Sequence, residues 1–254
     1  METGIRSPLI DQFRRGEVTR DVRLLAAQGA LAPRALEQVA LLAMLSEDAD
    51  PEIATVASAT IGKLPKDTLS AVLGRPEVTT ELRAFFEARG VKPGTPATDD
   101  GSPLVDISED PPEAGEADTA KDTRVLSSLP IVDRMKLAMK GSREQRAQLI
   151  RDSNRLVASA VLSSPKLTDT EVESFAKMAN VSEEVLRVIA ANRQWTKNYG
   201  VVLGLAKNPK TPPAISMQLL TRLSEKDTKM LAVDRNVPEA LRLAARKAMV
   251  KRLK

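Results

Sequence analysis

The sequence predicts an all-α protein built from short helices. Of its 254 residues 42% are apolar but only 2% are aromatic, so the core has to be packed from Leu, Ala, Val, Ile and Met. That composition is typical of closely packed helices rather than sheets. Apolar residues also recur at helical spacing between residues that start or end helices. The chain is long enough for one extended domain or two smaller ones.

The first ninety residues contain paired signals for helix starts and ends. Ser7-Pro8 predicts a helix with Ser7 as the N-cap and proline in the first turn, and Thr19 predicts the cap of a second helix that ends near Gly29. Asp50-Pro51 starts a later helix, which Gly62 is expected to end. We therefore expect residues 1–90 to form an N-terminal helical module.

A linker is predicted at residues 91–125. This segment contains five prolines, few apolar side chains, and nine acidic against three basic residues. Such a composition cannot bury enough apolar surface to fold, so we expect a disordered acidic linker. It either keeps the protein soluble or folds back to screen a basic neighbour.

The remaining residues, 126–254, form a basic helical module in this prediction, because they carry 24 basic and 12 acidic residues. Its expected helices are short and begin at recognisable caps. These caps are Ser142 with Gln145, Thr168 with Glu171, Ser182, Thr211 before Pro212, and Ser224 with Asp227.

Similar turns recur in this module without a strict period. Ser164-Pro165-Lys166 is echoed by Asn208-Pro209-Lys210, and Asn180-Val181-Ser182-Glu183 by Asn236-Val237-Pro238-Glu239. In the N-terminal module LSEDADPEIATVASATIGKL, residues 45–64, resembles a HEAT repeat, with an acidic turn followed by a proline-led helix. The helix pairs are also similar to the leucine-rich repeat variant. Either resemblance implies an α-solenoid of short antiparallel helix pairs.

Composition and motifs weigh against most enzyme classes. The chain has no cysteine and no histidine, which removes thiol nucleophiles, imidazole bases, the usual zinc ligands and the cysteines that hold an iron–sulfur cluster in some leucine-rich repeat variants. It has no GxxxxGK[ST] loop and no GxGxxG motif. We expect no catalytic residue, no metal site and no cofactor.

No membrane span is expected either. The longest unbroken apolar run, VALLAML at residues 39–45, is far shorter than a bilayer requires, and METGIRSPLIDQFRR at the start lacks the apolar core of a signal peptide. We therefore expect a cytoplasmic protein.

The stretch ANRQWTKNYG, residues 191–200, is the strongest candidate for a binding site. It holds the only tryptophan and the only tyrosine of the chain, Trp195 and Tyr199, beside Arg193 and Lys197. On one helix these aromatic residues would share a face and form a contact hot spot. Alternatively, Trp195 is a structural pin at the elbow between two helices. Further candidate partner-binding residues are Arg235, Arg242 and Arg246.

Three hypotheses for function follow. The first is a non-enzymatic adaptor that binds a partner protein through a solenoid surface, by analogy of fold. The alternative is nucleic-acid binding by the basic module, with the acidic linker as a competing polyanion. The third is an enzyme like the HEAT-like DNA glycosylases, which would need a carboxylate beside Trp195 in a basic cleft. The sequence leaves the oligomeric state open.

Overall fold

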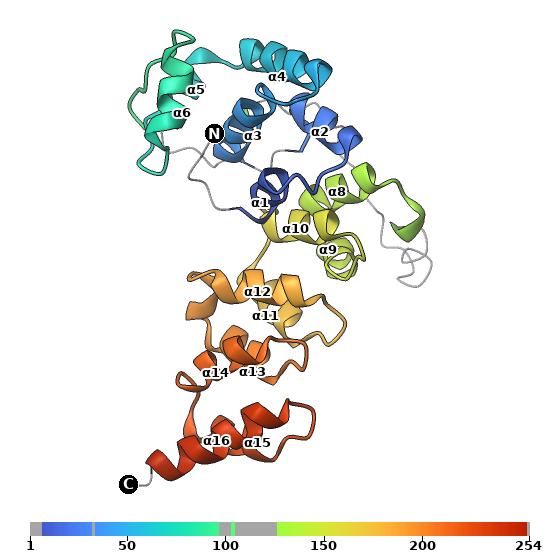
Figure 1. Ribbon diagram of the computed structural model, residues 1–254, viewed down its shortest axis with the longest axis vertical. Helices are drawn as coiled ribbons and strands as arrows, with labels where there is room; N and C mark the ends of the chain where they lie inside the picture. Colours follow the sequence, from blue (N-terminus) through green and yellow to red (C-terminus); the bar gives the residue numbers. More distant parts are fainter. Residues whose placement is uncertain (1–6, 32–33, 97–102, 105–125, 253–254) are drawn as a thin grey trace. The chain divides into compact units, whose positions relative to one another are not determined.

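The computed structural model in Figure 1 describes residues 7–31, 34–96, 103–104 and 126–252. Within these residues the regular structure is entirely helical, which confirms the predicted all-α class. The chain divides into two compact units. The first takes Met1–Gly141 and Ser159–Pro165, and the second takes Ser142–Ala158 and Lys166–Lys254.

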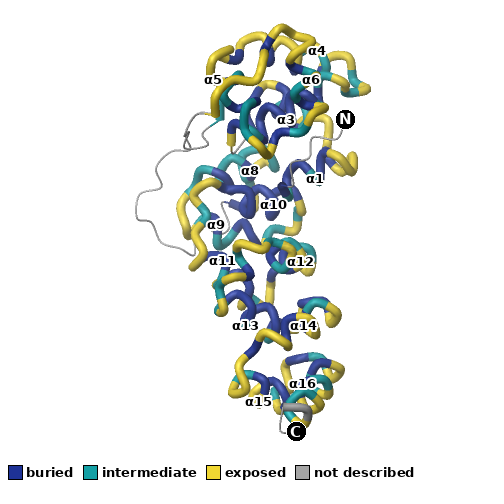
Figure 2. Tube along the Cα trace, turned by 90° about the vertical axis from the view of Figure 1, so that its left-hand side faces the viewer, coloured by how far each residue is buried: buried dark blue, intermediate teal, exposed yellow. Residues whose placement is uncertain are grey.

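Helix α3 lies at the centre of the first unit, because it contains the longest apolar run and contacts α1, α2, α4, α5 and α6. The helices of this unit whose bounds lie within the described residues are α1 (Pro8–Arg14), α2 (Arg20–Ala27), α3 (Ala35–Leu45), α4 (Pro51–Lys63), α5 (Lys66–Leu73), α6 (Thr80–Glu87), α8 (Ile131–Lys140) and the last part of α10 (Arg155–Ser163). Figure 2 shows α3 as an almost continuously buried segment.

The predicted helix starts of this unit are confirmed, but one predicted end is wrong. Ser7 precedes Pro8 at the start of α1, and the Asp50 side chain accepts a 3.0 Å hydrogen bond from the Glu52 amide at the start of α4. Gly62 does not end α4, which continues to Lys63. The helix ends where Leu64 turns into extended backbone, because a residue that precedes proline is disfavoured in the helical conformation.

Most of the predicted linker, residues 97–102 and 105–125, lies outside the described residues, and its disorder stays a prediction. Its described beginning packs on the first unit. The Ser70 hydroxyl donates a 2.7 Å hydrogen bond to the Lys92 carbonyl, and the Gly94 amide donates to the Ser70 carbonyl at 2.9 Å. Further along, the Leu104 amide donates to Gln38 Oε1 at 2.7 Å.

The second unit is a succession of short helices. They are α9 (Arg143–Leu149), the first part of α10, α11 (Asp169–Lys177), α12 (Glu183–Ala191), the 3-10 helix η1 (Trp195–Lys197), α13 (Tyr199–Lys207), α14 (Pro213–Leu220), α15 (Glu225–Val233) and α16 (Glu239–Arg252). The predicted caps at Ser142, Thr168, Ser182 and Ser224 are confirmed, because each side chain accepts a hydrogen bond from an amide of the first turn.

The predicted cap at Thr211 is wrong. Helix α14 begins at Pro213 with Pro212 in the capping position, so the Thr211 hydroxyl lies one residue too early to accept from the first turn. Its hydroxyl is buried and has no hydrogen-bond partner among the described residues.

Three helix pairs in the described part of the second unit share one type of turn: α11 with α12, α13 with α14, and α15 with α16. The residue directly after the first helix of each pair is Met178, Asn208 or Asp234, and it has extended backbone with φ between −72° and −69° and ψ between 119° and 121°. Three residues after this turn residue, each pair has a buried side chain of similar shape: Val181, Thr211 or Val237. These three residues occupy corresponding positions of the pairs.

Successive pairs also contact each other through helices that hold the same place in their pairs, first with first or second with second. Helix α13 packs on α11, and α16 packs on α14. Figure 2 shows α11, α13 and α15 along one side of this unit and α12, α14 and α16 along the other. The approach of α13 to α11 is close at Gly204, because a Cβ atom there would lie 3.2 Å from Ala176 Cβ and 3.1 Å from Lys177 Cγ, and these neighbours would have to move by a few tenths of an ångström.

Candidate functional site

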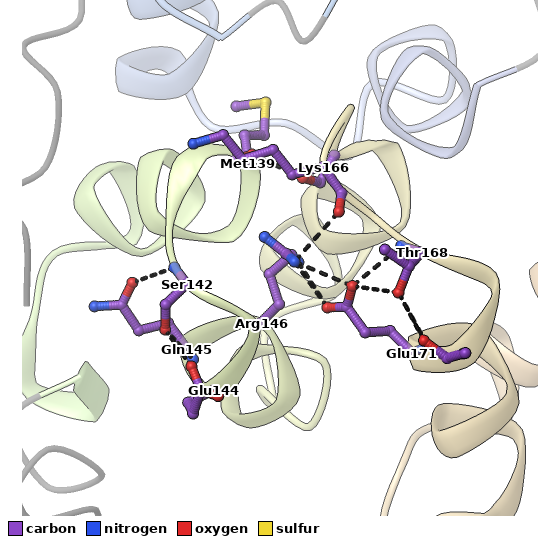
Figure 3. A network of polar contacts seen from close by, with 10 residues as sticks. Met139, Ser142, Glu144, Gln145, Arg146, Lys166, Thr168 and Glu171 are labelled. Carbon is purple, nitrogen blue, oxygen red and sulfur yellow. Dashed lines mark hydrogen bonds and ion pairs between the residues drawn. The ribbon is translucent and has the colours of Figure 1, made fainter. Parts of the chain in front are cut away.

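A buried polar network in the second unit joins α9 to the start of α11 (Figure 3). Arg146 and Glu171 are both buried, and Arg146 Nε donates to Glu171 Oε1 at 2.9 Å. Arg146 Nη2 donates to Glu171 Oε2 at 3.1 Å and to the Lys166 carbonyl at 3.3 Å. Glu171 Oε2 also accepts from the Thr168 amide at 3.0 Å, which closes the predicted capping box.

This network is built to hold two helices together rather than to react. Both oxygens of Glu171 accept hydrogen bonds from within the network, and the guanidinium of Arg146 binds the carboxylate with two nitrogens. A general acid or base would need an oxygen directed at a substrate. We therefore assign Arg146 and Glu171 to the packing of α9 on α11.

A second buried carboxylate, Glu37 on α3, lies in the first unit. Burial raises its pKa to about 7, while a hydrogen bond with Ser7 and the charge of Arg34 act in the opposite direction. Glu37 Oε2 has no hydrogen-bond partner among the described residues. Ser7 Oγ also lies 3.3 Å from Ser163 Oγ, so three polar side chains meet around the start of α1. Nothing in the sequence around Glu37 singled it out.

The two aromatic candidates of the second unit belong to different helices. Trp195 begins the short helix η1 and is half-buried, whereas Tyr199 begins α13 and is exposed. Between them Asn198 has extended backbone, with ψ at 120°, and its side chain accepts from the Gly200 amide at 2.8 Å. Trp195 and Tyr199 therefore do not belong to one helix, whereas a shared aromatic face would require both residues on the same helix.

The hydroxyl of Tyr199 is already engaged by the next helix pair. It donates a hydrogen bond to the Asp227 carboxylate and accepts one from the Ser224 amide at 3.0 Å. The hydrogen bond from Tyr199 holds the pKa of Asp227 below its ordinary value. Tyr199 thus fastens the start of α13 to the start of α15. Arg222 makes a second connection nearby, since it donates to the Thr196 carbonyl.

The structure places the cationic candidates in two groups. Arg193 and Lys197 are exposed on either side of Trp195, in the segment between α12 and α13. Arg235 is exposed in the turn after α15, while Arg242 and Arg246 lie on α16, where Arg246 Nε donates to the Ala232 carbonyl at 3.1 Å. These groups come from different helix pairs.

Sequence reasoning missed three exposed apolar side chains on α14 and α16. Met217 on α14 and Leu243 on α16 occupy corresponding positions, counted from the turn residues Asn208 and Asp234, and they expose 39% and 47% of their surface. Val250, two turns after Leu243 on α16, is also exposed. We call Met217, Leu243 and Val250 the apolar stripe. Aligning the two turns in the sequence would have shown that Met217 and Leu243 correspond.

Among the described residues, no three His, Cys, Asp or Glu side chains are grouped as metal ligands would be. None of the described helices combines the length and the apolar character that crossing a bilayer requires. Comparison of the chain with protein-family models, with curated proteins and with solved structures found no match.

Proposed function

We propose that this protein is a non-enzymatic adaptor whose second unit is a HEAT-like solenoid that binds a partner protein. The observation that carries the proposal is the apolar stripe: large apolar side chains are exposed at corresponding positions of neighbouring helices α14 and α16. Contiguous apolar patches on a protein surface commonly mark interaction sites. The shared turns and the contacts of α11 with α13 and of α14 with α16 support the solenoid.

The polar contacts between helices support the same proposal. Arg146 and Glu171 use their hydrogen-bonding capacity on each other and on the backbone, and Tyr199 uses its hydroxyl on α15. These residues strengthen the framework that presents α14 and α16. A rigid framework with an exposed surface is what an adaptor requires, since partner binding then costs little conformational entropy.

Co-purification with matched variants tests the adaptor. The tagged full chain, the variant Met217→Ser/Leu243→Ser and the control Met230→Ser are compared for the proteins they retain from native cells. Met230 is a suitable control because it is equally apolar and 48% exposed but lies on α15. We expect the double variant to lose partners that the control keeps. Retention of the same proteins by all three chains would contradict the proposal.

Nucleic-acid binding is the second candidate, and the exposed Arg193 and Lys197 beside the half-buried Trp195 favour it. A phosphate-binding surface makes affinity fall steeply with salt. The full chain is therefore titrated with fluorescent single- and double-stranded oligonucleotides at low and physiological salt, beside Arg193→Ser/Lys197→Ser. A variant in which the acids of residues 99–122 are replaced by their amides tests the linker as a competing polyanion. Binding unchanged by all of these substitutions would exclude this surface.

A further inference from the structure

The chemistry of the apolar stripe indicates what kind of partner fits it. This inference rests on the proposed adaptor function and deepens it. Met217 and Leu243 lie at corresponding positions of α14 and α16, and we call the line along which these two helices contact each other the seam. Leu243 and Val250 lie seven residues apart, about 10 Å along one face of α16. Apolar residues at that spacing match the i, i+3, i+4 and i+7 anchors of an amphipathic helix.

Charge around the stripe is mainly positive. Helix α14 has no charged residue at all, and the charged residues of α16 in the described side-chain range are Arg242, Arg246 and Lys247 against Glu239 alone. Lys247 lies between Leu243 and Val250 on the exposed side of α16. Glu239 stands one turn before Leu243, so the single negative charge lies at the start of the helix.

We propose that the seam of α14 and α16 binds an acidic amphipathic helix of a partner protein. Its apolar residues would cover Met217, Leu243 and Val250, and its carboxylates would meet Lys247 and the neighbouring arginines. Opposite charges at the rim of an interface raise the association rate and select the partner. The methionine adds adaptability, because its unbranched side chain adjusts to the shape of the residue it meets.

Two other ligands fit the stripe less well. A helix that binds a membrane surface has a continuous apolar face, whereas Lys247 interrupts the exposed face of α16 between Leu243 and Val250. Nucleic acids need stacking side chains and cations at the centre of their site. Met217, Leu243 and Val250 are aliphatic and offer no ring on which a base could stack.

A peptide panel tests the partner chemistry on the full chain. Three labelled peptides of roughly 20 residues are compared, and all three contain the same number of leucines and of polar residues. In the first peptide glutamates form the polar face, in the second lysines replace them, and the third is a scrambled form of the first. We expect the glutamate peptide to bind about tenfold more tightly than either of the others. Equal or tighter binding of the lysine peptide would overturn the proposal.

Variants locate the site. Met217→Ser/Leu243→Ser should weaken binding of the glutamate peptide about tenfold, since two apolar anchors are lost, and Met230→Ser should leave it unchanged. Lys247→Glu should weaken the glutamate peptide and strengthen the lysine peptide. This exchange of preference cannot arise from loss of folding, and its absence would contradict the charge argument.

The remaining arms distinguish the possible failures. If vesicles of phosphatidylcholine with phosphatidylglycerol, or an oligonucleotide, bind through Met217 and Leu243 while the glutamate peptide does not, the proposed partner is wrong. If retention of co-purifying proteins depends on Met217 and Leu243 but the glutamate peptide does not bind, the adaptor function is supported and the proposal of an acidic helix as partner is wrong. If neither co-purification nor peptide binding depends on the stripe, both proposals fall.

Discussion

Asn208 and Asp234 end helices α13 and α15 at corresponding positions, but only Asn208 ties its helix to the preceding pair. Asn208 Nδ2 donates to the carbonyls of Ala176 and Met178 at the end of α11, both at 2.9 Å. Its Oδ1 accepts from the Lys210 amide at 3.0 Å, and Asp234 repeats only this bond, with the Asn236 amide at 2.9 Å. A carboxylate has no N–H to donate, so α15 cannot copy the link that α13 makes.

Replacing Asn208 should therefore be costly. Asn208→Asp removes two buried donors, leaves two carbonyls without that partner and places a charge at a residue that is 2% exposed. We expect a loss of about 2–4 kcal/mol in the free energy of unfolding, measured by urea denaturation. The matched control is Asp234→Asn, which should change stability by less than about 0.5 kcal/mol. Equal effects of the two substitutions would contradict this role of Asn208.

Thr211→Val should stabilise the protein. The buried hydroxyl of Thr211 has no partner among the described residues, and the corresponding positions of the other two pairs are Val181 and Val237. Valine keeps the shape of threonine and removes the unmet hydrogen bond, so we expect a gain of about 1 kcal/mol. Thermal unfolding of the variant beside wild type measures it. A lower melting temperature would show that the hydroxyl has a partner in solution.

Removing Arg146 from its ion pair with Glu171 should destabilise the second unit strongly. Arg146→Met leaves the Glu171 carboxylate buried without its cation, which costs about 3–5 kcal/mol. Adding Glu171→Gln removes that charge and keeps an oxygen for the Thr168 capping box, so the double variant should be more stable than Arg146→Met alone. Urea denaturation of the four chains in a double-mutant cycle gives the coupling. Additive effects would show that the pair is not coupled.

Stability should also depend on pH through Glu37. Because burial raises its pKa from 4.5 to about 7, the folded protein favours the protonated acid. The resulting stability is complete below pH 4.5 and is lost as the pH rises through 7, by up to about 3 kcal/mol. We expect Glu37→Gln to be more stable than wild type at pH 8 and to lack this dependence. A constant difference between the two chains from pH 4 to pH 8 would contradict it.

Local chemistry explains which parts of the fold could be predicted. A cap such as Ser224 needs only the amide of a residue three positions later, so the sequence pattern is sufficient. The same applies to Thr168 with Glu171. The two errors arose where proline changed the outcome: Pro65 moved the end of α4, and the pair Pro212-Pro213 moved the start of α14 beyond Thr211.

The features that depend on distant residues could not be predicted. Tyr199 meets Asp227 across 28 positions of the chain, and Arg146 meets Glu171 across 25. No periodicity encodes such pairings, because they depend on how one helix pair packs on another. The exposure of Met217 and Leu243 was missed for the same reason: each side chain fits a helical apolar pattern, and only the packed structure shows which side of its helix stays uncovered.

Site-specific photo-crosslinking in native cells tests the adaptor most directly. A photoreactive amino acid replaces Leu243 in one chain and Met230 in another, so that both probes are exposed but lie on different helices, α16 and α15. The proposed function predicts a discrete crosslinked protein from position 243 that is absent from position 230. Crosslinks from position 230 alone, or no crosslink from either position while the chains are folded and expressed, would contradict binding at the stripe.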